Sequence, residues 1–86
     1  MKINQLIEII KKKIRKSVSV EELVTEDKTF LHKNHTTNQI GKFHIKLKIK
    51  SIKLSKMNKI QSTKVIYGVL AEELKENIHS IQILID

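Results

Sequence analysis

The 86-residue sequence contains no cysteine, no proline and no tryptophan. Without cysteine the chain cannot form disulfides, zinc fingers, a thiol nucleophile or an iron–sulfur site of its own. Any metal bound here must be held by histidine, by carboxylate, or by ligands that a partner supplies. No proline marks a rigid linker, and 86 residues are enough for one modest hydrophobic core. We therefore expect a single domain over residues 1–86.

Long hydrophobic runs are also missing, and none approaches the length that spans a membrane. The cluster Lys11–Lys13 follows the first apolar residues, whereas a signal peptide places its positive charge before them. These two features predict a cytosolic protein that does not interact with a membrane.

Positive charge is plentiful, with a formal net charge of +8 at pH 7. Such a charge is typical of proteins that bind nucleic acid or another anionic surface. However, every basic residue except Arg15 is lysine, so the bidentate contact that arginine makes with guanine is mostly unavailable. A compositional bias of the source genome explains the abundance of lysine, isoleucine and asparagine equally well.

Hydrophobic periodicity predicts the elements of the first half of the chain. Residues 3–16 have apolar side chains at helical spacing, namely Ile3, Leu6, Ile7, Ile10 and Ile14. Residues 17–27 indicate a weaker strand whose alternation slips at Leu23 and Val24, through either a bulge or a late strand start. Residues 28–42 form a long polar loop that carries His32 and His35. Residues 43–54 alternate as a strand with one buried face and a solvent face made by His44, Lys46, Lys48 and Lys50.

The second half of the chain predicts a helix that leads into a strand. Residues 55–64 form a short connection or one helical turn, with Ser55 or Ser62 as N-cap. The helix that follows ends at His79, after Asn77 in a left-handed conformation. Its expected buried face is Tyr67, Leu70, Ala71, Leu74 and Ile78, and its expected solvent face is Glu72, Glu73, Lys75 and Glu76. The alternation of residues 80–86 indicates the last strand and leaves His79 at the seam.

This order of elements predicts the fold class. A helical crossover between the last two strands makes them parallel, and the first two strands should be antiparallel. The helices should then all lie on one face of the sheet. We therefore expect a small α+β domain with a three-stranded mixed sheet.

The sequence offers two candidate sites. His32, His35 and His79 could together hold a metal through neutral imidazole, although scattered surface histidines are a commoner explanation. The row of Lys46, Lys48 and Lys50 could contact phosphates, although ordinary solvent exposure of a strand explains it better. The sequence shows neither a Ser-His-Asp arrangement nor a glycine-rich phosphate loop, so a hydrolase has little support.

Several short motifs occur in the second half of the chain, and their spacing from His44 to His79 matches that of a known family without a gap. They are His44-Ile45-Lys46-Leu47, Val65-Ile66-Tyr67, Leu70-Ala71-Glu72-Glu73-Leu74 and Ile78-His79-Ser80. With the acidic pair Glu26-Asp27 and the loop histidine His35 upstream, they make the chain resemble the BolA family. The resemblance implies a variant of the type II KH fold and a non-enzymatic adaptor. Members of that family pair with monothiol glutaredoxins and share a [2Fe-2S] cluster, for which the glutaredoxin and glutathione supply thiolates. The ligands implied for this chain are His79 and His35, with His32 as a substitute for His35.

Two departures from the family pattern bear on nucleic acid. The family's Arg-His-Arg segment is Ser62-Thr63-Lys64 here, and the Gly-x-x-Gly loop of KH domains is missing. The alternative function is nevertheless a nucleic-acid-binding module, like a transcriptional regulator, that uses Lys46, Lys48 and Lys50 together with Lys64. The sequence leaves open whether the free chain forms a weak homodimer.

Overall fold

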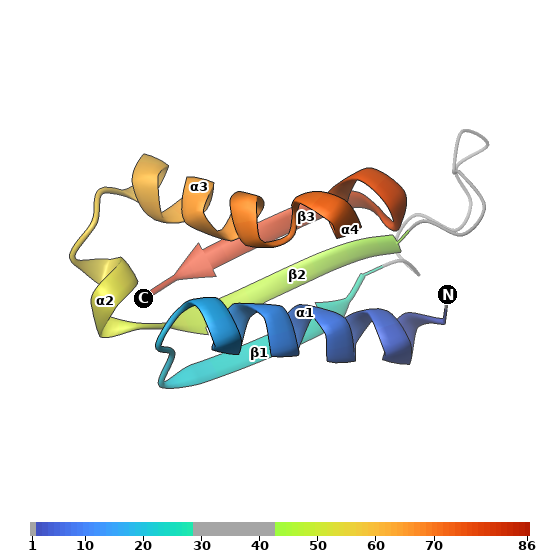
Figure 1. Cartoon of the computed structure of the whole chain (residues 1–86), viewed down its shortest axis with the longest axis horizontal. Helices are drawn as coiled ribbons and strands as arrows, with labels where there is room; N and C mark the ends of the chain where they lie inside the picture. Colours follow the sequence, from blue (N-terminus) through green and yellow to red (C-terminus); the bar gives the residue numbers. More distant parts are fainter. Residues whose placement is uncertain (1, 29–42) are drawn as a thin grey trace.

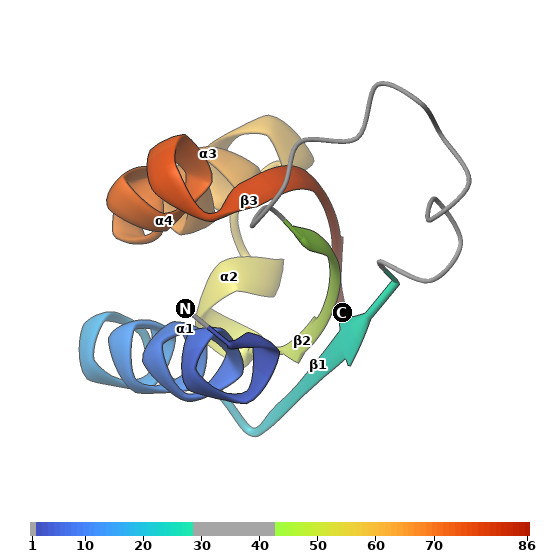
Figure 2. The ribbon, with the colours of Figure 1, turned by 90° about the vertical axis from the view of Figure 1, so that its right-hand side faces the viewer.

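The structure is a computed structural model that describes residues 2–28 and 43–86. Three strands form one sheet in the order β1-β2-β3, with β1 and β2 antiparallel and β2 and β3 parallel (Figure 1). Figure 2 shows the helices packed against one face of this curved sheet. The predicted α+β domain with a three-stranded mixed sheet and helices on one face is confirmed. The elements are α1 (Ile3–Ser17), β1 (Glu22–Asp27), β2 (Phe43–Lys50), α2 (Ile52–Ser55), α3 (Lys59–Val69), α4 (Ala71–Glu76) and β3 (Ile78–Ile85).

The hydrophobic core lies between the sheet and the helices. Helix α1 contributes the predicted apolar stripe, of which Leu6, Ile10 and Ile14 are fully buried. Strand β2 contributes the predicted inner face with Ile45, Leu47 and Ile49. Removing these side chains from water supplies the main driving force for folding. None of the helices among the described residues is both long enough and apolar enough to cross a membrane.

The first strand begins later than the predicted residue 17. Helix α1 continues to Ser17, Val18 follows as its C-cap, and β1 starts only at Glu22. Leu23 is buried while Val24 is 47% exposed, so these two neighbours alternate normally within β1. The apolar alternation was interrupted in the sequence because Val18 and Val20 precede the strand and do not belong to it. Of the two explanations, the late start is correct.

The second strand ends earlier than the predicted residue 54. Ser51 follows β2 and acts as the N-cap of α2, since its side chain accepts a hydrogen bond from the backbone N–H of Leu54 at 3.2 Å. The same hydroxyl donates to the carbonyl of Ser19 at 2.8 Å. Leu54 is 1% exposed and fills the core from a helical turn instead of from a strand. A short apolar run is ambiguous between strand and helix, which explains this error.

The prediction that Ser55 or Ser62 caps the next helix is wrong. Asn58 is the N-cap of α3, and its Oδ1 accepts a hydrogen bond from the backbone N–H of Gln61 at 2.8 Å. Ser62 instead lies buried within α3, where its hydroxyl donates to the carbonyl of Lys59 at 3.1 Å. The helix therefore starts at Lys59 and not at residue 65.

The predicted single helix up to His79 is two helices that meet at Leu70. The backbone of Leu70 has φ −102° and ψ 17°, which separates α3 from α4 and changes the phase of the buried face. The buried residues of this region are Ser62, Ile66, Leu70 and Glu73. Tyr67, which is 43% exposed, and Ala71, which is also exposed, do not belong to the buried face, contrary to the prediction. Asn77 ends α4 with φ −126° rather than in a left-handed conformation, because the chain continues directly into β3.

Candidate functional site

His79 is the second residue of β3 and is exposed to solvent. The sequence had suggested that His79 lies just before the last strand. The strand in fact begins at Ile78, so the histidine lies within it. The carbonyl of Asn77 accepts a hydrogen bond from the backbone N–H of Phe43 at 2.9 Å, and this bond ties the start of β3 to the start of β2. The backbone around the imidazole is therefore fixed by the sheet.

A β-bulge gives His79 its exposed position. Phe43 pairs with Ile78 and His44 pairs with Ser80, so His79 has no partner residue on β2. A bulge of this kind interrupts the alternation of a strand and redirects a side chain. Here His79 and Ser80 are both exposed in succession. The extra residue explains why Ile78 and Ile81, three positions apart, both pack against the core.

His44 lies next to His79 on the neighbouring strand. The centroids of the two rings are 5.0 Å apart, with an angle of 63° between the ring planes, which is an edge-to-face contact. The Nδ1 atom of His44 also lies 2.6 Å from Oγ of Ser80, so the two side chains share a hydrogen bond. His44 is only 6% exposed. The expectation that it faces solvent is therefore wrong, because contacts around it cover its ring.

A pocket of about 390 Å³ opens beside these residues. Its polar lining comes from β2, from β3 and from the residue after β1, and consists of Lys28, His44, Lys46, Ser80 and Gln82. No carboxylate of the described residues lines it. The positive charge of the lysines favours an anionic group at this place.

The structure describes one of the three predicted metal ligands. His32 and His35 lie outside the described residues, so their part in the site stays a prediction. Within residues 2–28 and 43–86, no group of three or more histidine, aspartate or glutamate side chains could hold a metal ion. An exposed imidazole is a good ligand for iron or zinc. It would serve here as one ligand of a site completed by other atoms.

The predicted lysine row lies on the face of the sheet away from the helices. Ile45, Leu47 and Ile49 point to the core, so the alternating Lys46, Lys48 and Lys50 point to the opposite face. Carboxylates accompany them on β1. Glu22 and Glu26 are the register partners of Lys50 and Lys46, and Glu26 lies 3.8 Å from the Nζ of Lys48.

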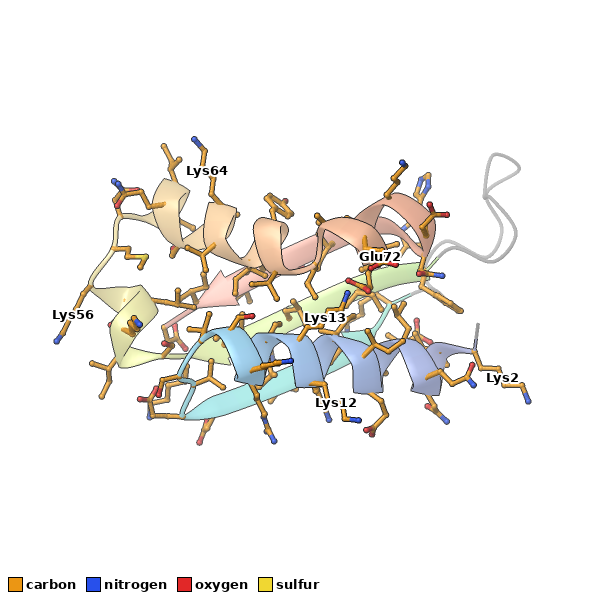
Figure 3. The ribbon with its side chains drawn as sticks, viewed as in Figure 1. Lys2, Lys12, Lys13, Lys56, Lys64 and Glu72 are labelled. Carbon is orange, nitrogen blue, oxygen red and sulfur yellow. The ribbon has the colours of Figure 1, made fainter. Side chains whose placement is uncertain are left out.

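Lys64 does not join this row. It lies on α3, which covers the other face of the sheet, and Figure 3 shows its side chain pointing away from the sheet. Lys46, Lys48 and Lys50 therefore share a surface with one another but not with Lys64.

Comparison with known proteins identifies the family. The sequence profile described as BolA-like protein matches residues 14–85. This chain belongs to the BolA-like family. Members of this family are small adaptor proteins. The match includes both His44 and His79, and it confirms the resemblance seen in the sequence motifs.

Solved structures of BolA-like proteins share the fold. BolA1 from Arabidopsis thaliana is 27% identical, with a TM-score of 0.77 over 92% of this chain and 87% of the other. The BolA domain of SufE1 from Arabidopsis thaliana is 24% identical, with a TM-score of 0.78 over 100% of this chain and 93% of the other. BolA1 from Mus musculus is 21% identical, with a TM-score of 0.72 over 90% of this chain and 60% of the other. The last two likenesses concern the fold alone. No curated protein sequence matches the chain significantly.

Two features of this site were missed in the sequence. The burial of His44 depends on tertiary contacts, which alternation along one strand does not report. The bulge at His79, in contrast, had a visible signal, since Ile78 and Ile81 are three positions apart whereas Ile81, Ile83 and Ile85 are two apart. That change of spacing is what an extra residue in a strand produces.

Proposed function

We propose that this BolA-like chain is a non-enzymatic adaptor that pairs with a monothiol glutaredoxin and supplies histidine ligands to a shared [2Fe-2S] cluster. The observation that carries the proposal is the exposed imidazole of His79 at a bulge of β3. It is fixed by the sheet, open to a second protein, and located in a family whose members are adaptors.

His79 is the principal ligand in this proposal. His35 is the second ligand, with His32 as a substitute, and the glutaredoxin together with glutathione contributes the thiolates that this cysteine-free chain lacks. Histidine ligation at one iron raises the reduction potential of such a cluster above that of an all-thiolate cluster. The pairing fits a reducing compartment such as the cytosol, where glutathione keeps thiols reduced.

The residues around His79 support this role by orienting the ring. The bulge directs the side chain outward, and the edge-to-face contact with His44 restricts the rotation of the imidazole. His44 is held in turn by its hydrogen bond to Ser80. The lysines of the adjacent pocket favour a partner that presents negative charge, such as a glutathione carboxylate.

The test is reconstitution of the mixed cluster. The chain is mixed with a monothiol glutaredoxin, iron, sulfide and glutathione, and the visible absorption and circular dichroism spectra are recorded. His79→Ala should change the spectrum of the mixed cluster, because one iron loses its imidazole ligand. Leu84→Ala is the matched control, since Leu84 is also exposed on β3 but does not line the pocket beside His44 and Ser80.

An unaltered spectrum for His79→Ala would remove the proposed role of this residue. His35→Ala and His32→Ala, measured separately, decide which of these two histidines is the second ligand. If neither changes the spectrum, neither histidine is the second ligand.

A further inference from the structure

The outer side of α3 carries large apolar side chains that nothing in the described part of the chain covers. Ile60 is 70% exposed and Tyr67 is 43% exposed, and the two residues lie two helical turns apart on the same side. Between them runs a groove of about 420 Å³, lined by Lys59, Ile60, Thr63, Lys64 and Tyr67. We call Ile60, Thr63, Lys64, Tyr67 and Gly68 the outer α3 stripe.

Gly68 gives the outer α3 stripe a point of close approach. The residue is exposed within α3, and a Cβ added there would meet no atom within 4 Å. Glycine is less favourable than alanine inside a helix. Neither packing within the described residues nor a positive φ requires glycine at this position. A missing side chain on an exposed helical face lets the backbone of a second helix approach closely.

The charges along the groove select the kind of partner. Its only charged lining residues among the described ones are Lys59 and Lys64, both of which are exposed. Neither makes an ion pair with another described residue. A partner that places carboxylates on both sides of an apolar ridge would match this pattern.

We propose that the outer α3 stripe is a docking site for an acidic amphipathic helix of another protein. Apolar residues of that helix pack on Ile60 and Tyr67 and cross over Gly68, while its carboxylates pair with Lys59 and Lys64. This recognition uses the ordinary geometry of two packed helices, with apolar anchors at helical spacing.

The docking site is separate from His79. Helix α3 begins beside α2, at the opposite end of the sheet from the start of β3 (Figure 1). The groove of the outer α3 stripe and the pocket beside His44 and Ser80 share no lining residue, so a partner on the stripe and a partner at His79 use different side chains. The docking proposal stands or fails independently of the proposed cluster.

Two other occupants fit the surface less well. A second copy of this chain carries a net charge of +8 as well, so two copies repel each other. Duplex DNA would use the two lysines, but it would leave Ile60 and Tyr67 without apolar contacts. An acidic protein helix satisfies both the apolar and the charged groups.

The test is an NMR titration of the 15N-labelled chain with two synthetic peptides of about five helical turns. Both peptides carry a leucine stripe, which is flanked by glutamates in one peptide and by lysines in the other. The glutamate peptide should shift the amide signals of Ile60, Tyr67 and Gly68. It should bind at least about tenfold more tightly than the lysine peptide, because only the former complements Lys59 and Lys64.

Matched variants test which side chains contribute to binding of the glutamate peptide. Ile60→Ser should weaken binding of the glutamate peptide by about tenfold, since the substitution removes a central apolar anchor. Ile52→Ser is the control, because Ile52 is 61% exposed but lies on α2. Both sites are on the surface, so the variants should keep the parent's circular dichroism spectrum. Gly68→Ala should also weaken binding, although alanine favours the helix.

Four results would overturn the proposal. The first is equal binding of both peptides, and the second is equal weakening by Ile52→Ser and Ile60→Ser. The third is dimerisation in analytical ultracentrifugation that Ile60→Ser abolishes, which would assign the stripe to a second copy. The fourth is salt-dependent binding of duplex DNA that shifts the amide signals of the stripe and is tighter than binding of the glutamate peptide. That result would assign the stripe to nucleic acid.

Discussion

Glu73 brings a carboxylate into the space between α1 and α4, where the residue is only 5% exposed. Its Oε2 lies 2.6 Å from the Nζ of Lys13, and Glu72 adds a longer contact at 3.5 Å. Figure 3 shows Lys13 on α1 facing Glu72 on α4. The hydrogen bond with Glu73 raises the pKa of Lys13 above its usual 10.5, and the attraction of both glutamates adds to this effect. The raised pKa reflects an ion pair that joins the two helices.

Replacing Lys13 should destabilise the fold. Lys13→Met leaves the buried carboxylate of Glu73 without its cation, which is costlier than losing an exposed ion pair. We expect a clear fall in Tm, whereas Lys12→Met should have little effect because Lys12 is exposed on the same helix. Equal Tm values for the two variants would show that the pair contributes no stability.

The contribution of this pair should also depend on pH. The folded pKa of Lys13 lies above its unfolded value of 10.5, so the stabilisation is fully present below that pH. It is lost as the pH rises through the folded pKa. The difference in Tm between the parent and Lys13→Met should therefore stay constant from neutral pH to about pH 10 and shrink above it. A difference that widens in alkali would contradict this assignment.

At the level of single residues, the sequence indicated which side chains to consider better than it indicated how buried they are and what they contact. His79 was singled out through its place in a sequence motif. The structure shows that it is exposed, while its role as a ligand stays a prediction. The contact between His44 and His79, and the pair between Lys13 and Glu73, join residues that are far apart in the chain. Periodicity describes one element at a time, so it placed both His44 and Glu73 in solvent.

Among the elements, the junction between α2 and α3 is set by caps. Ser51 caps α2 and Asn58 caps α3, so two helical segments are separated by a short turn after Ser55. This junction lets Leu54 reach the core while α3 starts in a new direction. The caps therefore determine where the outer α3 stripe begins.

Loss of the second cap should cost a defined amount of stability. Asn58→Ala should lower the free energy of unfolding by about 1 kcal/mol, because the first turn of α3 loses its side-chain acceptor. The measurement is urea denaturation followed by circular dichroism. Ser55→Ala is the control, since Ser55 does not cap α3 and should cost less. A larger loss for Ser55→Ala would contradict the assignment of Asn58 as the cap.

The limits of elements were less predictable than their existence. Every predicted helix and strand corresponds to an observed one, but the ends of β1, β2 and α3 were misplaced. Serine, asparagine and short apolar runs each suit more than one conformation, and the choice depends on packing. The break at Leu70 is the clearest case. An uninterrupted helix correctly placed Leu70, Leu74 and Ile78 towards the core, but it wrongly buried Tyr67 and Ala71 and wrongly exposed Glu73.

Across the whole molecule, the sheet divides the positive charge between two sides. Lys46, Lys48 and Lys50 occupy the open face of the sheet, and Lys64 occupies the helical side. Glutamates of β1 partly neutralise the open face. These four lysines therefore do not form one continuous surface for DNA.

Binding to duplex DNA should accordingly be weak and only moderately sensitive to salt. Three lysines on one face predict a slope of log affinity against log salt no steeper than about −3. Changing Lys46, Lys48 and Lys50 to glutamine should flatten the slope, while Lys64→Gln should leave it unchanged. Fluorescence anisotropy at several salt concentrations measures both. A much steeper slope, or an equal effect of Lys64→Gln, would favour the DNA-binding alternative.

The arrangement of the whole fold was predictable because few topologies suit this order of elements. A helical crossover makes β2 and β3 parallel, and a short chain has helices enough to cover only one face of the sheet. The registers could not be predicted, since a single extra residue in β3 changes which side chains face the open side.

The closeness of His44 and His79 comes entirely from the parallel pairing of β2 and β3. The chain must pass through three helices before these rings can meet, so neither an unfolded nor a partly folded chain holds them together. Contact between the two rings therefore requires that β3 has already paired with β2 in its native register.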